Sequence, residues 1–367
     1  MNIYIKVIAI TAVLAVIFRN NKKMFVISAS LVHLFVSGFR YKYMHGDLQK
    51  YAFEFGNISG YDWNSDELLK GGRNSLFYLL NKAVAILFNG EFQALLFLVA
   101  LISTVSIAVL VYKYSTKPFI SFLMWNCFGF YIFSFYSIKQ TLAMAFIMFA
   151  GIAILENKMW RFLVLVIIAG FIHLPAFVFL PAYIICGLRK TENIITIYII
   201  LFLSIFLARN KIVGILVDLY YESEKYTSVN MGGLGGKCLL MISLLVVGFL
   251  FCGLSDEKFR KIFILLTLAS LLQIFSMYDN VFTRLADYYF QFIILFAPLM
   301  LSQVHKKNQY PALYFDVPSQ KIIVLLFVMM ALLFYQKTNL TERVGISDND
   351  NLLNYHFMWD EEVSGNY

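Results

Sequence analysis

Long apolar runs separated by short clusters of charged residues make up most of this chain. A helix crosses the hydrocarbon core of a bilayer with about 20 mostly apolar residues, or fewer when aromatic or lysine side chains anchor its ends. The pattern is typical of an all-α, polytopic integral membrane protein. Cutting the sequence at its charge clusters predicts about twelve spans, at residues 3–18, 24–39, 92–112, 119–136, 138–155, 160–172, 175–188, 194–208, 237–254, 262–277, 285–304 and 321–335.

One further apolar stretch, residues 76–89, is short and carries Asn81 and Lys82 near its centre. We interpret it as a re-entrant or interfacial helix. Counting it as a span would put the loop with Lys113 and Lys117 on the opposite side of the membrane from the other basic loops.

The basic residues orient the spans, because short loops rich in Lys and Arg stay in the cytoplasm. One alternation of spans puts all the dense basic clusters on the same side of the membrane. That side then has 15 basic and 5 acidic residues, a net charge of +10. The rest of the chain has a net charge of −2, which together gives the total of +8. Both termini then lie outside, and residues 1–18 read as an uncleaved first span. The clusters are Arg19/Lys22/Lys23, Lys113/Lys117, Lys158/Arg161, Arg189/Lys190, Lys258/Arg260/Lys261 and Lys306/Lys307 with Lys321.

Composition agrees with this pattern. The chain is 60% apolar and 14% charged, against roughly a quarter charged in a typical globular protein. A mean hydropathy of +0.72 excludes disorder, a fibrous repeat, a nucleic-acid binder and almost any cytosolic enzyme. The four cysteines show no metal-binding spacing.

The predicted organisation is a single transmembrane domain over residues 1–335, with external loops at 40–91 and 209–236, followed by a polar, acidic and external tail at 336–367. The cytoplasmic loops are mostly about 4 to 7 residues long and leave no room for a nucleotide-handling domain. Any chemistry is therefore expected at the outer face. The glycine-rich residues 232–236 before Lys237 miss the spacing of a phosphate loop and are interpreted as a flexible lead into the next span.

Ionisable residues in or beside the membrane are costly, so they usually face a cavity or a partner. Each such residue here also has an ordinary explanation as a flanking anchor, a snorkelling lysine, a helix cap or an internal ion pair. Together they suit a polyanionic lipid headgroup, because cations on one side can bind phosphate. They form five groups at the predicted external interface: Arg40 with Gly46 and Asp47; Arg73; Lys139 with Gln140; His173 before Pro175; and Asp279 with Arg284, Asp287, Tyr288 and Gln291, the last four on one helix face.

At these residues the sequence resembles the EpsG family of Wzy-type bacterial polysaccharide polymerases. The resemblance covers roughly residues 35–300 and departs from the family pattern at Lys139, where the family has an Arg. The matching motifs are Phe39-Arg40-Tyr41 with Gly46-Asp47 and Tyr51, Lys139-Gln140 with Ala143, Phe171-Ile172-His173, and Arg284 with Tyr288.

The resemblance implies a GT-C-like glycosyltransferase in the bacterial cytoplasmic membrane, with its active site facing the periplasm or exterior. It would move a growing glycan from undecaprenyl pyrophosphate to a lipid-linked repeat unit, without nucleotide, metal or other cofactor. Expected partners are these lipid-linked oligosaccharides, the bilayer, a chain-length regulator and a flippase, but no nucleic acid.

The resemblance also implies roles for the individual residues. The pyrophosphate would be bound by Arg40, Lys139 and Arg284, with Arg73 in reserve, and the base would be either Asp47 or His173. Supporting residues would be Gln140, Tyr288 and Asp279.

Several alternatives also put cations in a membrane cavity. A flippase or other transporter of lipid-linked sugars would be expected to line both halves of the membrane. A membrane acyltransferase would use a histidine such as His173 but commonly takes its donor from the cytoplasm. A ligase or another lipid-linked glycosyltransferase, or a structural subunit of a synthesis complex, are the remaining possibilities.

Overall fold

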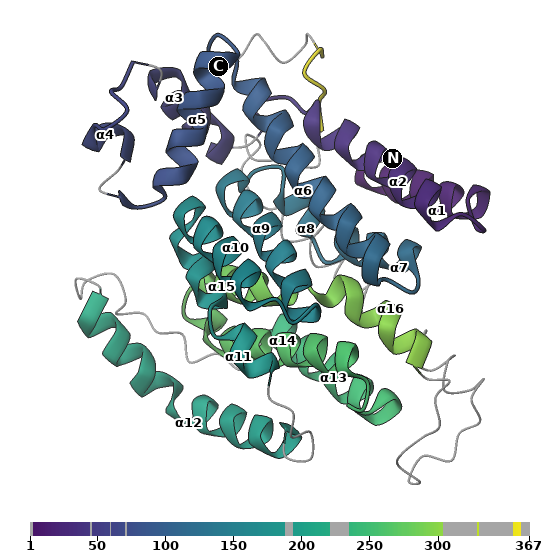
Figure 1. Ribbon diagram of the computed structural model, residues 1–367. Helices are drawn as coiled ribbons and strands as arrows, with labels where there is room; N and C mark the ends of the chain where they lie inside the picture. The colour runs from purple at the N-terminus through teal and green to yellow at the C-terminus, as the bar shows by residue number, and fades with distance from the viewer. Residues whose placement is uncertain are drawn as a thin grey trace. The chain divides into compact units, whose positions relative to one another are not determined.

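The computed structural model describes residues 3–44, 46–58, 60–69, 72–187, 194–220, 235–303, 329 and 355–360 (Figure 1). Across these residues the regular elements are helices, with one isolated antiparallel bridge between Arg40 and Phe357. The chain divides into two compact units, which are described separately. The first holds Met1–Phe177 and Met329–Tyr367, and the second holds Val178–Val328.

Most predicted apolar runs are helical, because charged, Asn, Gly or Pro residues at their ends begin or end a helix. The first unit contains α1 (Ile3–Ile17), α2 (Lys22–Gly38), α3 (Gly46–Ile58), α4 (Asp66–Leu69), α5 (Ser75–Leu87), α6 (Phe92–Tyr114), α7 (Pro118–Cys127), α8 (Phe130–Phe133), α9 (Ile138–Leu155) and α10 (Met159–Ile172). The short helix η2 (Leu174–Phe179) follows α10. Two predicted loops differ: α12 (Ile194–Tyr220) continues beyond the run at 194–208, and the loop at 40–91 contains the helices α3 and α4 as well as α5.

Three predicted spans are broken. The run at 119–136 divides into α7 and α8 at Gly129, whose φ of 80° is a left-handed conformation that glycine adopts easily. The run at 175–188 becomes η2 and α11 (Ala182–Cys186). The run at 285–304 becomes α15 (Asn280–Phe290) and α16 (Ile293–Gln303), bent by 41°.

By length and composition, four described helices can cross a membrane, or five if the bent pair is one span. They lie at Phe92–Tyr114, Ile138–Leu155, Ile194–Gly214 and Glu257–Met277. Five shorter apolar segments, of 10 to 17 residues, accompany them. Twelve spans therefore remain a prediction. The run at 321–335 lies outside the described residues except for Met329, as do the basic residues at 189–190, 306–307 and 321.

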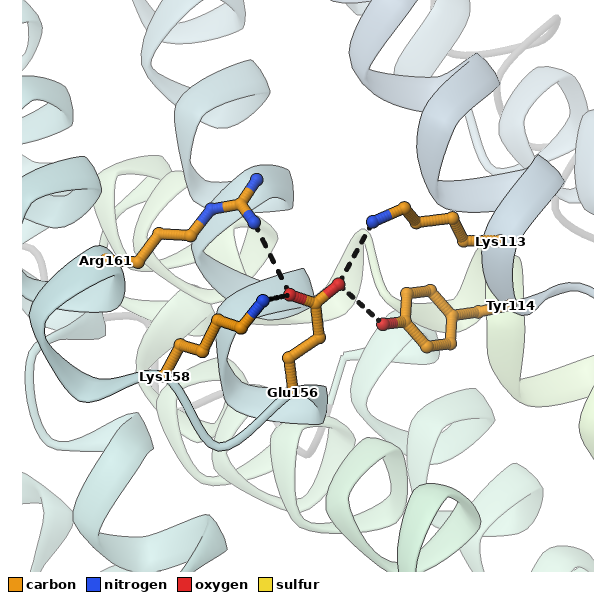
Figure 2. Close-up of polar contacts among 5 residues, drawn as sticks. All are labelled: Lys113, Tyr114, Glu156, Lys158 and Arg161. Atoms are coloured by element: carbon orange, nitrogen blue, oxygen red, sulfur yellow. Dashed lines mark hydrogen bonds and ion pairs between the residues drawn. The ribbon is translucent and has the colours of Figure 1, made fainter.

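One end of the first unit collects basic side chains, and we call it the basic end. Glu156, in the turn from α9 to α10, accepts from Lys158 at 2.8 Å, from Lys113 at 3.0 Å and from Arg161 at 3.4 Å (Figure 2). The Tyr114 hydroxyl donates to the same carboxylate at 3.2 Å. The Lys158 and Lys113 ammonium groups hold the pKa of Glu156 at about 2, well below the usual carboxyl value.

Lys22 extends this end to the start of α2, since its Nζ donates to the Ser115 carbonyl at 2.7 Å, just after α6. Three of the basic clusters that the sequence assigns to one side of the membrane thus lie at one end of the unit.

The opposite end, which we call the Arg40 end, joins the last turn of α2 to the first turn of α6. Gln93 Nε2 donates to the Gly38 carbonyl at 2.8 Å, and Lys42 pairs with Glu91 at 3.3 Å. Tyr4, near the start of α1, packs edge-on against Phe135, with ring centroids 5.5 Å apart.

Helix α5 begins and ends at the Arg40 end. The Oδ1 atom of its N-cap residue, Asn74, accepts from the Leu174 N–H at 2.8 Å, directly after α10, and its last turn leads within a few residues into α6. Figure 1 shows α3, α4 and α5 together beside this part of α6. At 13 residues, α5 is shorter than the four helices long enough to span a membrane, and its re-entrant or interfacial placement stays a prediction.

The second unit contains α11, α12 (Ile194–Tyr220), α13 (Gly236–Cys252), α14 (Glu257–Gln273), η4 (Ile274–Met277), α15 and α16. Phe259 of α14 stacks on Phe296 of α16, with ring centroids 5.2 Å apart. Gly248 of α13 faces the same ring, and a Cβ atom there would lie only 2.4 Å from it. Glycine at this position lets α13 and α16 approach closely.

Candidate functional site

Arg40 is fully buried at the end that bears its name. Its Nε donates to the Phe135 carbonyl at 3.0 Å and one terminal nitrogen donates to the Ser37 carbonyl, while the guanidinium lies 5.4 Å from the centre of the Phe135 ring. The other terminal nitrogen is buried with no hydrogen-bond partner. Arg40 therefore ties the end of α2 to the turn before α9, and keeps one donor unused.

A segment from the far end of the sequence covers Arg40. The Tyr41 N–H donates to the His356 carbonyl and the Met358 N–H donates to the Phe39 carbonyl, both at 2.9 Å, which forms the bridge between Arg40 and Phe357. The Tyr355 hydroxyl donates to the Val36 carbonyl at 2.7 Å. We call residues 355–360 the strap.

The predicted lysine, Lys139, sits at the second position of α9 inside an aromatic cage. Its Nζ lies 4.7 Å from the ring centre of Tyr78, 5.1 Å from Phe77 and 5.6 Å from Tyr51, and it donates to the Tyr78 hydroxyl at 3.1 Å. The N-cap residue Ser137 makes no side-chain hydrogen bond to the first turn of α9. A lysine and an uncapped helix N-terminus together favour a phosphate group.

Three other predicted residues belong to segments that meet around α5. Asp47 opens α3 and lies one turn before Tyr51, whose ring faces Lys139. Arg73 is exposed in the turn before α5, and the next residue, Asn74, is bonded to Leu174 directly after His173. His173 is half-buried and ends α10, as the sequence break at Pro175 predicts.

Gln140 follows Lys139 on α9 and is buried. The structure thus brings together the segments that carry Asp47, Arg73, Lys139 and His173, while Arg40 holds the turn that leads into Lys139.

A groove of about 640 Å³ lies at the Arg40 end, between the end of α2 and the start of α6. Lys42 and Glu91 stand at its polar part, and Phe97, Leu98 and Leu101 of α6 give it an apolar wall. Met358 of the strap also lines it. A groove that is polar at one end and apolar along its length suits a lipid with a charged headgroup.

The fifth predicted group lies in the second unit, on α15. Asp279 caps the helix through a 2.7 Å bond from the Val281 N–H, Arg284 is exposed, and Tyr288 is fully buried. Asp287 is buried and pairs with Lys237 of α13 at 2.5 Å. The sequence left open an ion pair between Arg284 and Asp287. In the structure Asp287 pairs with Lys237.

Sequence reasoning missed two parts of these sites. Lys237 was expected only to end a flexible lead, yet its side chain is 14% exposed and neutralises Asp287. The strap falls in the tail predicted to be polar and acidic. Its signal was the alternation of Tyr355, Phe357 and Trp359, which is typical of an extended segment with one packed face.

A buried histidine was also missed. His33 of α2 donates from Nδ1 to the Ala29 carbonyl at 2.7 Å and accepts at Nε2 from Asn126 at 2.8 Å, with its ring stacked on Trp125. Its hydrogen bonds are satisfied inside the helix packing, so its role there is structural. Among the described residues, no three His, Cys, Asp or Glu side chains come together as a metal site.

Comparison with known proteins gives one match. The model of the EpsG family matches residues 23–357, a range that includes both Arg40 and Phe357 of the strap. No curated protein and no solved structure matches the chain.

Proposed function

Because the chain belongs to the EpsG family, whose model matches residues 23–357, we propose that it is a polysaccharide polymerase of the Wzy type. The growing glycan on undecaprenyl pyrophosphate is the donor, and a single repeat unit on the same lipid is the acceptor. The family match is the observation that carries this proposal.

The transfer needs a base for the acceptor and charge stabilisation for the leaving group. A hydroxyl oxygen of the acceptor sugar forms a bond to the anomeric carbon of the donor, and the bond from that carbon to the pyrophosphate oxygen breaks. The hydroxyl proton goes to Asp47 or His173. The departing pyrophosphate keeps the bonding electron pair, and its charge is stabilised by fixed cations.

Lys139 is the principal cation in this proposal. Its ammonium stands at the uncapped N-terminus of α9, so lysine and helix dipole act on the same anion. Arg73, exposed in the turn before α5, is a further phosphate ligand, and Gln140 of α9 supports the site. The phosphate-binding role of Arg284 and the supporting roles of Tyr288 and Asp279, all in the second unit, stay predictions from the sequence. Fixed cations of this kind supply the electrostatic stabilisation without a metal ion or a nucleotide.

Arg40 acts as a positioning residue here. Its bond to the Phe135 carbonyl holds the turn that presents Lys139, and full burial keeps its guanidinium away from a headgroup. The groove beside α6 takes the first part of the polyprenyl chain along Phe97, Leu98 and Leu101.

The reaction takes place at the outer leaflet of the bacterial cytoplasmic membrane, with the Arg40 end facing the exterior or periplasm. The clustering of Lys113, Lys158 and Arg161 at the opposite end supports this orientation. A flippase would supply the lipid-linked repeat units, and a chain-length regulator would limit the product.

Reconstitution tests the function directly. Purified protein in liposomes receives undecaprenyl-pyrophosphate-linked repeat units without nucleotide or added metal, and the products are separated by gel electrophoresis. A ladder of glycan lengths is expected. A single shifted band would instead indicate a ligase, and movement of the substrate across the bilayer without any longer product would indicate a transporter.

A further inference from the structure

A second pocket, of about 530 Å³, lies at the basic end, between the turn from α1 to α2 and the loop from α6 to α7. Three cationic residues line it, Arg19, Lys22 and Lys117, and its lining contains no Asp or Glu. None of the three forms an ion pair among the described residues, in contrast to Lys113, Lys158 and Arg161, which share Glu156.

Backbone geometry adds to the positive character of this pocket. The first residues of α7, Phe119 and Ile120, line it, and the N-cap residue Lys117 makes no side-chain hydrogen bond to their turn. The N–H groups of the first turn of a helix carry partial positive charge and bind anions. Lys22 is held in place by its 2.7 Å bond to the Ser115 carbonyl.

The rest of the pocket wall combines the polar residues Asn20 and Thr116 with apolar side chains. The apolar part of the lining consists of Ala15 of α1, Phe18 of the turn that follows and Phe25 of α2. The next residues of α1, Val16 and Ile17, are 72% and 63% exposed. A free inorganic anion would make no favourable contacts with these apolar side chains. A phospholipid has a phosphate for the cations and acyl chains for the apolar surface.

We propose that this pocket binds the headgroup phosphate of an anionic glycerophospholipid at the membrane surface. Arg19 and Lys117 contact the phosphate, the first turn of α7 donates to it, and the acyl chains run along the exposed face of α1. This site is separate from the proposed polymerase site and does not depend on that activity.

The test compares two double variants that remove the same charge from the same end. Arg19→Gln/Lys117→Gln changes the pocket, and Lys23→Gln/Lys158→Gln changes exposed lysines outside it. The full chain is purified in detergent and titrated with phosphatidylglycerol or phosphatidylcholine, and bound lipid is counted by native mass spectrometry. Retention of phosphatidylglycerol should fall about 10- to 30-fold in the pocket variant and less than about twofold in the control.

Three results would overturn the proposal: equal loss in both variants, no loss in the pocket variant, or complete displacement of phosphatidylglycerol by inorganic phosphate. Phosphatidylcholine retention should be unchanged in all forms. Thermal unfolding of each variant checks the fold. If the double variant is unfolded, Lys117→Gln alone is used, with an expected loss of about fivefold.

Discussion

The two ends of the first unit hold their cations in different environments. At the basic end the cations are exposed, and three of them surround the single carboxylate of Glu156. At the Arg40 end, Arg40 is buried against backbone carbonyls and Lys139 is enclosed by aromatic rings. Exposed cations orient a membrane protein at little energetic cost, whereas buried cations must be held by the fold. This difference agrees with the proposed division between cations that orient the chain at the basic end and cations that act in the site at the Arg40 end.

Replacing Lys139 should have the largest effect on activity. Lys139→Met is expected to reduce polymer formation about 100-fold or more, because it removes a charge that stabilises the leaving group. Lys139→Arg should retain most activity, since it keeps the positive charge. Polymer length and amount are measured by electrophoresis of glycan from cells that lack the wild-type protein.

Lys113→Met is the matched control from the basic end, and it should change polymer formation by less than about twofold. Equal losses from Lys139→Met and Lys113→Met would remove the functional distinction between the two ends.

Replacing Arg40 tests positioning against direct binding. Arg40→Met leaves the Phe135 and Ser37 carbonyls without donors, so the free energy of unfolding should fall by about 2–4 kcal/mol while polymer formation is lost. Phe357→Ala, which weakens the strap, should produce a smaller loss of both. An Arg40→Met protein with wild-type thermal stability and no polymer would show that Arg40 contacts the substrate instead.

The ion pair in the second unit extends the comparison to Lys237, a partly buried cation that is paired with a buried carboxylate. Lys237→Met leaves Asp287 buried without its partner and should lower the free energy of unfolding by about 3–5 kcal/mol. The double variant Lys237→Met/Asp287→Asn should recover most of this loss, as a double-mutant cycle in denaturant measures. Additive losses in the cycle would mean that the two residues act independently.

Glu156 gives the smallest effect, and the size of this effect depends on pH. Because its pKa is lowered to about 2 from an ordinary 4.5, the stabilisation is fully present above pH 4.5 and is lost as the pH falls toward 2. Glu156→Gln should lower the Tm by a few degrees at pH 7. The difference from the wild type should shrink at pH 3, and a constant difference across this range would rule out the ion cluster as its cause.

The helices and their boundaries were largely predictable from the sequence. Apolar runs fixed α6, α9 and α10, and the basic clusters correctly indicated which helix ends lie together in the first unit. The short, polar-centred sequence of residues 76–89 correctly predicted a helix, α5, that is shorter than the spanning helices. These features depend on local composition, which the sequence states directly.

Partners across long sequence distances were not predictable. Nothing local to Lys139 indicates that Tyr51 and Tyr78 surround it, and the glycines before Lys237 concealed its pairing with Asp287. The same limit hid the burial of Arg40, whose cover comes from the other end of the chain. Packing between helices decides which side chains contact a given cation, and this packing cannot be predicted from a single sequence.

The strap also sets the order in which the Arg40 end is assembled during synthesis. Tyr355 and its partner Val36 are 319 residues apart, so the strap leaves the ribosome after all the described helices. Until then, the guanidinium of Arg40 lacks its cover. With the orientation proposed above, the return of the strap to α2 requires an even number of membrane crossings between α2 and Tyr355. A nascent chain that inserts one helix wrongly therefore delivers its last aromatic residues to the wrong side, and its Arg40 end stays open.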